Sequence, residues 1–212
     1  MTTQANRVCQ YLHETLSSLS RYRTGFNPDG LPRNGLYFLF ETGENAHGSE
    51  RIVRVGTHTG QNNLLKRLNE HLNAKKDRSV FRKHIGRCLL CKRQDPFLDA
   101  WEIDLTEKAT RLEKARLVDQ KKLAEIEEEV SEYINQNFSF TLLMSDTKEQ
   151  RRFFEDGSIG AIAQCENCKA SENWLGKHHP DHRIKDSGLW NIQGLKHTPV
   201  AYDDAVRFIR TV

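Results

Sequence analysis

Hydrophobic side chains alternate with other side chains over positions 36–41, and this period of two predicts a β-strand. The segment 43–48 contains two glycines, which favours a turn. Apolar positions return over 52–58 and predict the second strand of an antiparallel hairpin. A third apolar segment, 138–144, predicts another strand, so the chain can build a small sheet.

Alternation along a hairpin also predicts which side chains share a face. We expect one face to be buried and to carry Leu36, Phe38, Phe40, Val53 and Val55. Tyr37 and Arg54 then lie on the other face, where Gly56 leaves space for a backbone or a ligand. The hairpin therefore brings a phenol and a guanidinium together.

Apolar residues three or four positions apart predict helices over 3–19, 62–74, 79–91, 106–137 and 148–164. Gly157 and Gly160 weaken the last of these, and 96–106 is expected to be a strand or an extended segment. The apolar stripe of the fourth helix consists of Leu112, Leu123, Ile126, Val130 and either Tyr133 or Ile134. A solvated amphipathic helix is favoured there over a partner-binding coiled coil.

Together these elements predict an α/β (α+β) fold with a small antiparallel three-stranded sheet flanked by helices. A long helical insertion, about 96–137, would separate the second strand from the third. We expect an N-terminal helix and approach segment over 1–34, a main domain over 35–176, and a C-terminal extension over 177–212 packed on that domain.

Charge is distributed unevenly in this chain of 212 residues, whose net charge is only +3. From Arg51 to Arg93 there are twelve cationic and two anionic side chains, a local excess that favours nucleic acid as the partner. A basic surface neutralised by later acidic segments is the alternative. Apolar runs are too short for a membrane span, and 1–20 lacks the apolar core of a signal peptide. We therefore expect a cytoplasmic protein with reduced cysteines.

Several groups suited to phosphodiester chemistry follow one another along the chain. Gly35-Leu36-Tyr37 opens the first strand, and Arg54-Val55-Gly56 lies on the second. Arg67 and His71 are four positions apart, so they project from one side of the next helix. Glu155 lies on a later helix, and Asn173 follows in Asn173-Trp174-Leu175-Gly176.

In this order the chain resembles the GIY-YIG nuclease superfamily, and its restriction-endonuclease-like members in particular. Arg54 stands where the family has its second tyrosine, as in members that place a basic residue there. The resemblance implies a metal-dependent endonuclease acting on DNA, in a restriction or defence setting. It implies the site residues Tyr37, Arg54, Arg67, His71, Glu155 and Asn173, with Mg²⁺ or Mn²⁺ bound by Glu155.

The residue types fit this chemistry. Arg67 can hold two phosphate oxygens with its planar fork, and one carboxylate can suffice for Mg²⁺, which keeps several waters. Two groups compete for the role of base. Tyr37 needs neighbouring cations to lower its pKa, whereas the usual pKa of a histidine such as His71 is already near neutrality.

Six further cations are expected to contact nucleic acid, DNA rather than RNA: Lys66, Lys75, Lys76, Arg78, Arg82 and Lys83. No membrane contact is expected, and a homodimer stays open. A catalytically inactive nucleic-acid-binding module on the same fold is one alternative. A protein-interaction adaptor acting through the helix over 106–137 is another.

Two C-x₂-C pairs could together hold a structural Zn²⁺ ion through Cys88, Cys91, Cys165 and Cys168. The first pair flanks two leucines in a predicted helix, so ordinary core thiols are the alternative. We interpret His178, His179 and His182 as a polar loop or a phosphate contact rather than a metal site. Burial is the expected fate of Trp101, Trp174 and Trp190, ahead of stacking on bases.

Overall fold

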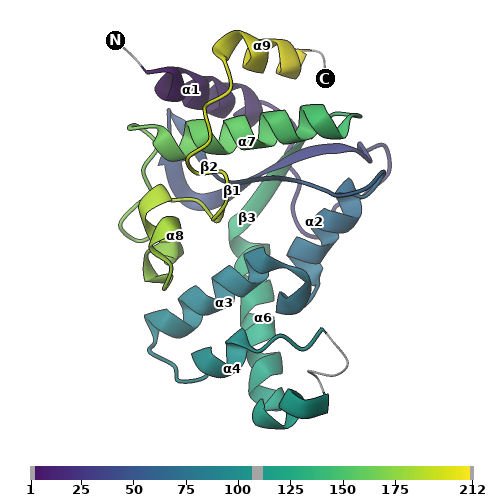
Figure 1. Cartoon of the computed structure of the whole chain (residues 1–212), viewed down its shortest axis with the longest axis vertical. Helices are drawn as coiled ribbons and strands as arrows, with labels where there is room; N and C mark the ends of the chain where they lie inside the picture. The colour runs from purple at the N-terminus through teal and green to yellow at the C-terminus, as the bar shows by residue number, and fades with distance from the viewer. Residues whose placement is uncertain (1–2, 107–111, 211–212) are drawn as a thin grey trace.

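The computed structural model describes residues 3–106 and 112–210. Its centre is an antiparallel sheet with the strand order β2-β1-β3 (Figure 1). The strands are β1 (Gly35–Ala46), β2 (Ser49–Thr57) and β3 (Phe138–Met144). β1 pairs with both other strands, so it is buried on both edges and holds the sheet together. The predicted three-stranded antiparallel sheet is confirmed.

Helices cover both faces of the sheet. Within the described residues the α-helices are α1 (Gln4–Ser17), α2 (Leu64–Asn73), α3 (Val80–Lys92), α4 (Leu98–Glu102), α6 (Gln120–Asn137), α7 (Lys148–Gln164), α8 (His182–Ser187) and α9 (Tyr202–Arg210). Short 3-10 turns occur at η1 (Lys76–Arg78), η2 (Ala115–Leu117) and η3 (Leu175–His178). In Figure 1, α1, α7 and α9 lie above the sheet, and α2, α3, α4 and α6 lie below it.

The two faces of the sheet belong to two separate apolar clusters. Leu36, Phe38 and Phe40 pack with α1 and α7, whereas Tyr37 and Leu39 pack with α2, α3 and α6. This alternation matches the predicted face pattern except at Val53, which lies with Tyr37 and not with Leu36.

A register shift explains the exception at Val53. Leu39 pairs with Arg54, but the next residue, Phe40, pairs with Ile52. One residue of β2 is therefore bulged out of the ladder, and the side chains before it change face. Val53 joins the cluster below the sheet, and Ile52 takes the expected place beside Phe40.

The hairpin turn is shorter than predicted. β1 continues through the expected turn region 43–48 as far as Ala46, and only His47 and Gly48 make the turn. Both have positive φ angles, 51° and 75°. Such angles are typical of tight two-residue hairpin turns, in which Gly48 is unstrained.

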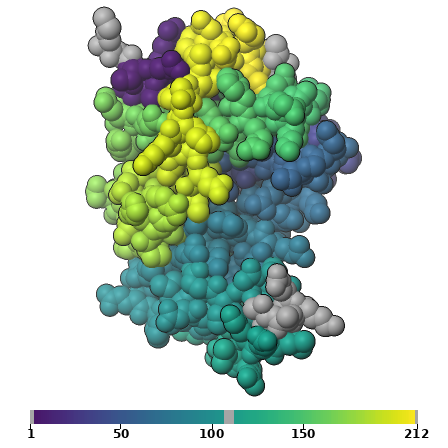
Figure 2. Space-filling view, in the orientation of Figure 1, coloured from purple at the N-terminus to yellow at the C-terminus, as the bar shows by residue number. Residues whose placement is uncertain are grey.

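The insertion between β2 and β3 forms the lower part of the molecule (Figures 1 and 2). The segment 96–106, expected to be a strand or an extended segment, is corrected in part: a short helix, α4, occupies Leu98–Glu102, and residues 103–106 after it are not helical. The helix forms because Trp101 is fully buried against α3, where a Cβ atom at Gly86 would lie 2.2 Å from the indole. Packing of one tryptophan therefore decided the local structure.

The predicted helix over 106–137 is interrupted. Residues 107–111 lie outside the described residues, and α6 begins anew at Gln120 behind the N-cap Asp119, whose carboxylate accepts from the N–H groups of Lys121 and Lys122. Ile126, Val130 and Ile134 are buried as expected, but Leu112 is 74% exposed. The α6 stripe thus faces the core of the protein.

The C-terminal segment crosses α7 on its way back to α1 (Figure 2). Gly157 and Gly160, which weakened the helix prediction, permit this crossing. A Cβ atom at Gly157 would lie 2.7 Å from Val200, and one at Gly160 would lie 2.2 Å from the carbonyl oxygen of His197. α9, which the sequence pattern did not predict, then packs Tyr202 on Tyr11 of α1.

Among the described residues, no helix has both the length and the apolar character needed to cross a membrane.

Candidate active site

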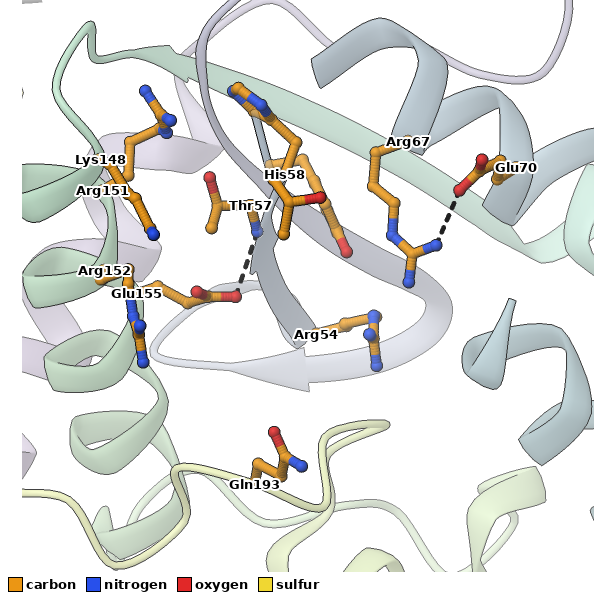
Figure 3. Close-up of a pocket in the computed structure, with 12 residues that line it drawn as sticks. Arg54, Thr57, His58, Arg67, Glu70, Lys148, Arg151, Arg152, Glu155 and Gln193 are labelled. Atoms are coloured by element: carbon orange, nitrogen blue, oxygen red, sulfur yellow. Dashed lines mark hydrogen bonds and ion pairs between the residues drawn. The ribbon is translucent and has the colours of Figure 1, made fainter. Parts of the chain in front are cut away.

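Four of the six predicted site residues line one pocket beside the sheet. Tyr37 comes from β1, Arg54 from β2, Arg67 from α2 and Glu155 from α7. Figure 3 shows Arg67 and Glu155 on opposite walls of this pocket, with Arg54 between them and nearer the strand. Segments more than a hundred residues apart in sequence therefore meet in one place.

Tyr37 lines the pocket, and His71 holds its hydroxyl on the side away from the pocket. Its ring is almost fully buried, and its hydroxyl lies 2.7 Å from Nε2 of His71. The other ring nitrogen of His71 lies 2.7 Å from Oγ of Ser79, which also accepts the N–H of Arg82 as the N-cap of α3. The phenol is therefore the end of this chain of hydrogen bonds that lines the pocket.

His71 does not face the pocket. It is fully buried, and this burial, with Arg54, Arg67 and Arg82 nearby, holds its pKa well below the usual value. A neutral imidazole results, because a charged one would be both desolvated and repelled. His71 is in hydrogen-bond contact with the Tyr37 hydroxyl and is not among the residues that line the pocket.

The second tripeptide, Arg54-Val55-Gly56, packs closely against the phenol of Tyr37. A Cβ atom at Gly56 would lie 2.2 Å from the Tyr37 hydroxyl, on the residue that pairs with Tyr37 across the hairpin. The space that the sequence left at Gly56 is thus filled by Tyr37. This contact gives the glycine of Arg54-Val55-Gly56 a direct physical reason.

The two arginines present guanidinium groups from different elements. Arg54 donates to the carbonyl oxygen of Trp190, while its Nε is buried without a hydrogen-bond partner among the described residues. Arg67 donates to Glu70 at 2.8 Å and to the carbonyl oxygen of Arg78 at 3.1 Å, and its side chain is 29% exposed. Both lie within reach of an anion entering the pocket.

Glu155 supplies a carboxylate on the wall of the pocket opposite Arg67. The backbone N–H of Thr57 donates to its Oε1 at 3.1 Å, which fixes the direction of the side chain (Figure 3). Burial raises the pKa of Glu155 above the usual value, and the charge of Arg54 opposes this rise.

The sequence interpretation missed three cations of the pocket. Lys148, Arg151 and Arg152 line it together with Glu155. All four lie on α7 with spacings of three, four and seven, so they share one face of the helix. That periodicity of charged residues was the signal that could have found them.

His58 is a fourth lining residue that the sequence did not single out. It follows β2 directly, and its Nε2 accepts from the N–H of Gly35 at 3.3 Å. Burial and the nearby charge of Arg151 lower its pKa. It therefore holds the start of the first tripeptide against the end of the second.

Asn173 does not belong to this pocket. It is exposed, while the buried Trp174 beside it donates to Glu41 at 2.8 Å. Asn191 instead lies next to the pocket: its side chain donates to the carbonyl oxygen of Val55 and accepts the N–H of the same residue. Asn191, 18 residues after Asn173, is thus the asparagine that contacts the second tripeptide.

The six cations predicted to contact nucleic acid divide into two groups. Lys66, Lys75 and Arg78 are exposed, and Lys83 is half-buried in an ion pair with Glu102. Lys76 and Arg82 are only 2% and 1% exposed. Their charges bind partners inside the fold, so these two residues are corrected from surface contacts to core groups.

Lys76 and Arg82 join different segments of the insertion between β2 and β3 by hydrogen bonds. The ammonium group of Lys76 donates to Asp77 and to the carbonyl oxygen of Ile103. The guanidinium group of Arg82 bonds to the carbonyl oxygen of Leu72 and to Glu127. Sequence composition cannot separate such buried cations from exposed ones.

The predicted pairing of the two C-x₂-C sequences is not what the structure shows. Cys88 packs in the apolar cluster below the sheet, whereas Cys165 and Cys168 pack in the cluster above it. A metal ion cannot bridge these groups through the sheet. Cys91, on the same helix as Cys88, is likewise separated from the second pair.

The remaining aromatic and histidine candidates are mostly buried. Trp101, Trp174 and Trp190 are at most 2% exposed, so none presents a face for stacking on bases. His178 and His182 are exposed, but His179 is buried and its Nε2 lies 2.9 Å from Nδ1 of His84. His179 is thus a core group rather than a phosphate contact.

The donor set fits a divalent ion that arrives with a phosphate. Glu155 has one oxygen on Thr57, and its second oxygen has no hydrogen bond among the described residues. The pocket, however, is lined by five cationic side chains and only two carboxylates, and one of these, Glu70, is paired with Arg67. Phosphate oxygens and water would have to complete the coordination of Mg²⁺.

One comparison with known proteins identifies the family of the chain. The family model described as a GIY-YIG domain matches residues 3–208, nearly the whole chain. A comparison with curated proteins gave no match, and a comparison with solved structures gave none either.

Proposed function

Because the chain belongs to the GIY-YIG nuclease superfamily, we propose that it is an endonuclease that hydrolyses phosphodiester bonds in DNA with the help of Mg²⁺ or Mn²⁺. The observation that carries this proposal is the convergence of Tyr37, Arg54, Arg67 and Glu155 on one cation-rich pocket. A restriction or defence role is part of the proposal, because Arg54 stands in place of the second tyrosine.

The pocket is suited to a polyanionic backbone. Lys148 and Arg152 are exposed on the α7 side, and Lys66 is exposed on the α2 side, beside Arg67. A strand lying across the pocket would meet cations on both of its flanks. Contacts of this kind position a nucleic acid through its phosphates without reading its bases.

Arg67 and Arg54 are the groups that would hold the scissile phosphate. The Arg67 guanidinium enters the pocket from α2, and its ion pair with Glu70 keeps it extended there (Figure 3). When the phosphate is attacked, its oxygens gain negative charge, and preorganised guanidinium groups stabilise that charge. Arg54 supports the same oxygens from the strand side.

Tyr37 is the group that would take the proton of the attacking water. Its hydroxyl faces the pocket on one side and His71 on the other. To take that proton, Tyr37 must first have given up its own, and Arg54 and Arg67 would stabilise the phenolate charge. Buried His71, whose pKa is held well below its usual value, orients the phenol through their hydrogen bond. The two candidate bases of the sequence therefore act as one unit, in which Tyr37 contacts the substrate and His71 positions Tyr37.

Glu155 is the residue that would hold the divalent ion, through the oxygen that Thr57 leaves open. When bound, such an ion neutralises phosphate charge and stabilises the leaving oxygen. Burial raises the pKa of Glu155, and a cation held there would favour the ionised carboxylate. The neighbouring N–H of Thr57 keeps the carboxylate aimed at the pocket in either state.

The proposal is tested by incubating supercoiled plasmid DNA with the full chain and Mg²⁺, and with EDTA as the metal-free control. Arg67→Ala and Glu155→Gln should each abolish nicking. Arg116→Ala and Glu149→Gln, which change exposed residues outside the pocket, should leave it intact. Nicking that survives in both pocket variants would overturn the site.

A non-cleaving binding module is the second candidate, favoured by Arg54 in place of tyrosine. Tight, salt-sensitive binding of duplex DNA without turnover in either Mg²⁺ or Mn²⁺ would establish it instead. An adaptor acting through α6 is not supported, since the apolar stripe of α6 packs inside the protein.

A further inference from the structure

A second cluster of reactive side chains lies above the sheet, away from the pocket. Cys9 comes from α1, and Cys165 and Cys168 follow the end of α7. His13 is one turn beyond Cys9 on α1, and His47 lies in the turn between β1 and β2. Three segments that are distant in sequence therefore bring three thiols and two imidazoles together.

The distances within the cluster suit metal binding, in two groups of three side chains that share one thiol. The ligand atoms of Cys9, His47 and Cys165 all lie within 4.8 Å of one another, and so do those of Cys9, His13 and Cys168. Cys9 belongs to both groups. Nε2 of His47 is 3.4 Å from Sγ of Cys165. A tetrahedral zinc site separates sulfur and nitrogen ligands by about 3.5 Å, as its bond lengths require.

His13 is already used by the fold. Its Nδ1 lies 2.8 Å from the carbonyl oxygen of Cys9, and its Nε2 accepts the N–H of Ile52 at 3.0 Å. A backbone N–H pointing at Nε2 and a carbonyl oxygen at Nδ1 fix one neutral tautomer and occupy its only lone pair. His13 therefore has nothing left to donate to a metal.

His47 has the opposite character. It is half-buried, its Nε2 points at Cys165, and it is held in place by a backbone with a φ angle of 51°. A non-glycine residue rarely adopts that conformation, and it persists where the surroundings require it. His47 is thus the imidazole that can complete a set of four ligands.

The three thiols of the cluster are closed to solvent, and a hydrogen bond braces the loop that carries two of them. Cys9 and Cys165 are 0% exposed and Cys168 is 1% exposed. The loop between Cys165 and Cys168 is joined to α1 because the N–H of Glu166 donates to the side chain of Asn6 at 2.9 Å. A set of four N and S ligands that leaves no open position is typical of structural rather than catalytic zinc.

We propose that Cys9, Cys165, Cys168 and His47 bind one structural Zn²⁺ ion. The three thiols lose their protons to solvent as their sulfurs bind the metal, and His47 binds as the neutral imidazole through Nε2. The ion joins α1, the end of α7 and the hairpin turn. Because α7 carries Glu155, the same ion anchors the helix that forms one wall of the pocket.

The proposal is independent of the nuclease activity, so its test measures metal content. The full chain, purified without chelators, should contain about one zinc ion per molecule by mass spectrometry of its metals. Cys165→Ser and His47→Ala should each lower that content severalfold. Cys88→Ser, Cys91→Ser and His178→Ala serve as matched controls from other parts of the molecule and should keep it.

A second measurement covers variants that fail to fold. Zinc removed from the wild-type protein is replaced by Co²⁺, which should give the intense charge-transfer absorption of cobalt bound to thiolates in a tetrahedral site. A wild-type protein that lacks zinc and gives no such absorption would overturn the proposal. Zinc retained in Cys165→Ser would do the same, and zinc lost in His13→Gln but kept in His47→Ala would overturn the choice of His47.

Discussion

The hydroxyl group of Tyr37 and Nε2 of His71 lie 2.7 Å apart, with the phenol facing the pocket and the imidazole sealed behind it. This order makes His71 a positioning residue. Removing it should lower the rate of cleavage without weakening DNA binding. We expect His71→Ala to reduce the single-turnover rate by about 10²-fold or more, and Tyr37→Phe to reduce it further.

Two measurements distinguish this role from a merely structural one. DNA affinity measured in Ca²⁺ should be unchanged in His71→Ala, and His71→Gln should recover part of the rate by restoring a hydrogen bond to the phenol. Since the pKa of His71 is held well below its usual value, the wild-type rate should show no inflection near pH 6.5 from this residue. Loss of affinity equal to the loss of rate would contradict the assignment.

Gly56→Ala tests the packing of the second tripeptide on the phenol. The added Cβ atom would lie 2.2 Å from the Tyr37 hydroxyl, so the ring must move out of its place. Cleavage should be lost, and the free energy of unfolding should fall by about 1–3 kcal/mol. A double-mutant cycle measures this contact: chemical denaturation gives the free energy of unfolding of the wild type, Gly56→Ala, Tyr37→Ala and the double variant. The cost of Gly56→Ala should largely vanish when Tyr37 is absent, and an unchanged cost would refute the contact.

The exposed cations beside the pocket should carry the salt dependence of DNA binding. Arg152→Ala and Lys148→Ala should each weaken binding to any sequence and reduce the salt slope by about 0.9. Lys121→Ala is the control, because its side chain is 89% exposed on α6, away from the pocket. Binding titrations over a range of salt concentrations measure both effects. An equal loss in the control would show that only net charge matters.

The buried pair of His84 and His179 should make the protein sensitive to mild acid. Burial lowers the pKa of His84 to about 2 and that of His179 to about 4. Below about pH 6.5 the unfolded chain therefore binds protons that the folded chain refuses, and stability falls as the pH falls. Each histidine contributes a slope of up to about 1.4 kcal/mol per pH unit.

Denaturant titrations between about pH 7 and pH 5 would measure this slope. His84→Gln should make the slope shallower by about one proton, because one of the two buried imidazoles is gone. His178→Gln changes an exposed histidine and should leave the slope as it is. Identical slopes in all three proteins would mean that the pair does not govern the acid sensitivity.

The sheet and most helices could be predicted because their signals are local. Alternation along 36–41 and the apolar stripe at Leu64, Leu68 and Leu72 hold within one element, and both are observed. The prediction failed at Val53 because a single bulged residue changes the face of a strand. It failed at α4 because burial of Trp101 against Gly86 is a tertiary contact.

The candidate site likewise divides into residues that local signals could predict and residues that only tertiary contacts place. Tyr37, Arg54, Arg67 and Glu155 could be placed because order along the chain and the face of each element point to one corner. The asparagine could not, since Asn173 and Asn191 both follow α7 in loops and only the fold shows which one contacts Val55. The predicted pairing of the cysteines was wrong for a similar reason. The sheet separates Cys88 from Cys165, and spacing along the chain does not reveal a sheet between them.

The central claim is that the guanidinium group of Arg67 and the carboxylate of Glu155, on opposite walls of the pocket, act on one phosphodiester. The most direct test is the rate at which purified protein nicks supercoiled plasmid DNA in Mg²⁺. The account predicts nicking by the wild type, none with EDTA, and none by Glu155→Gln or Arg67→Ala despite retained folding. Undiminished nicking by Glu155→Gln, or nicking in EDTA, would contradict it.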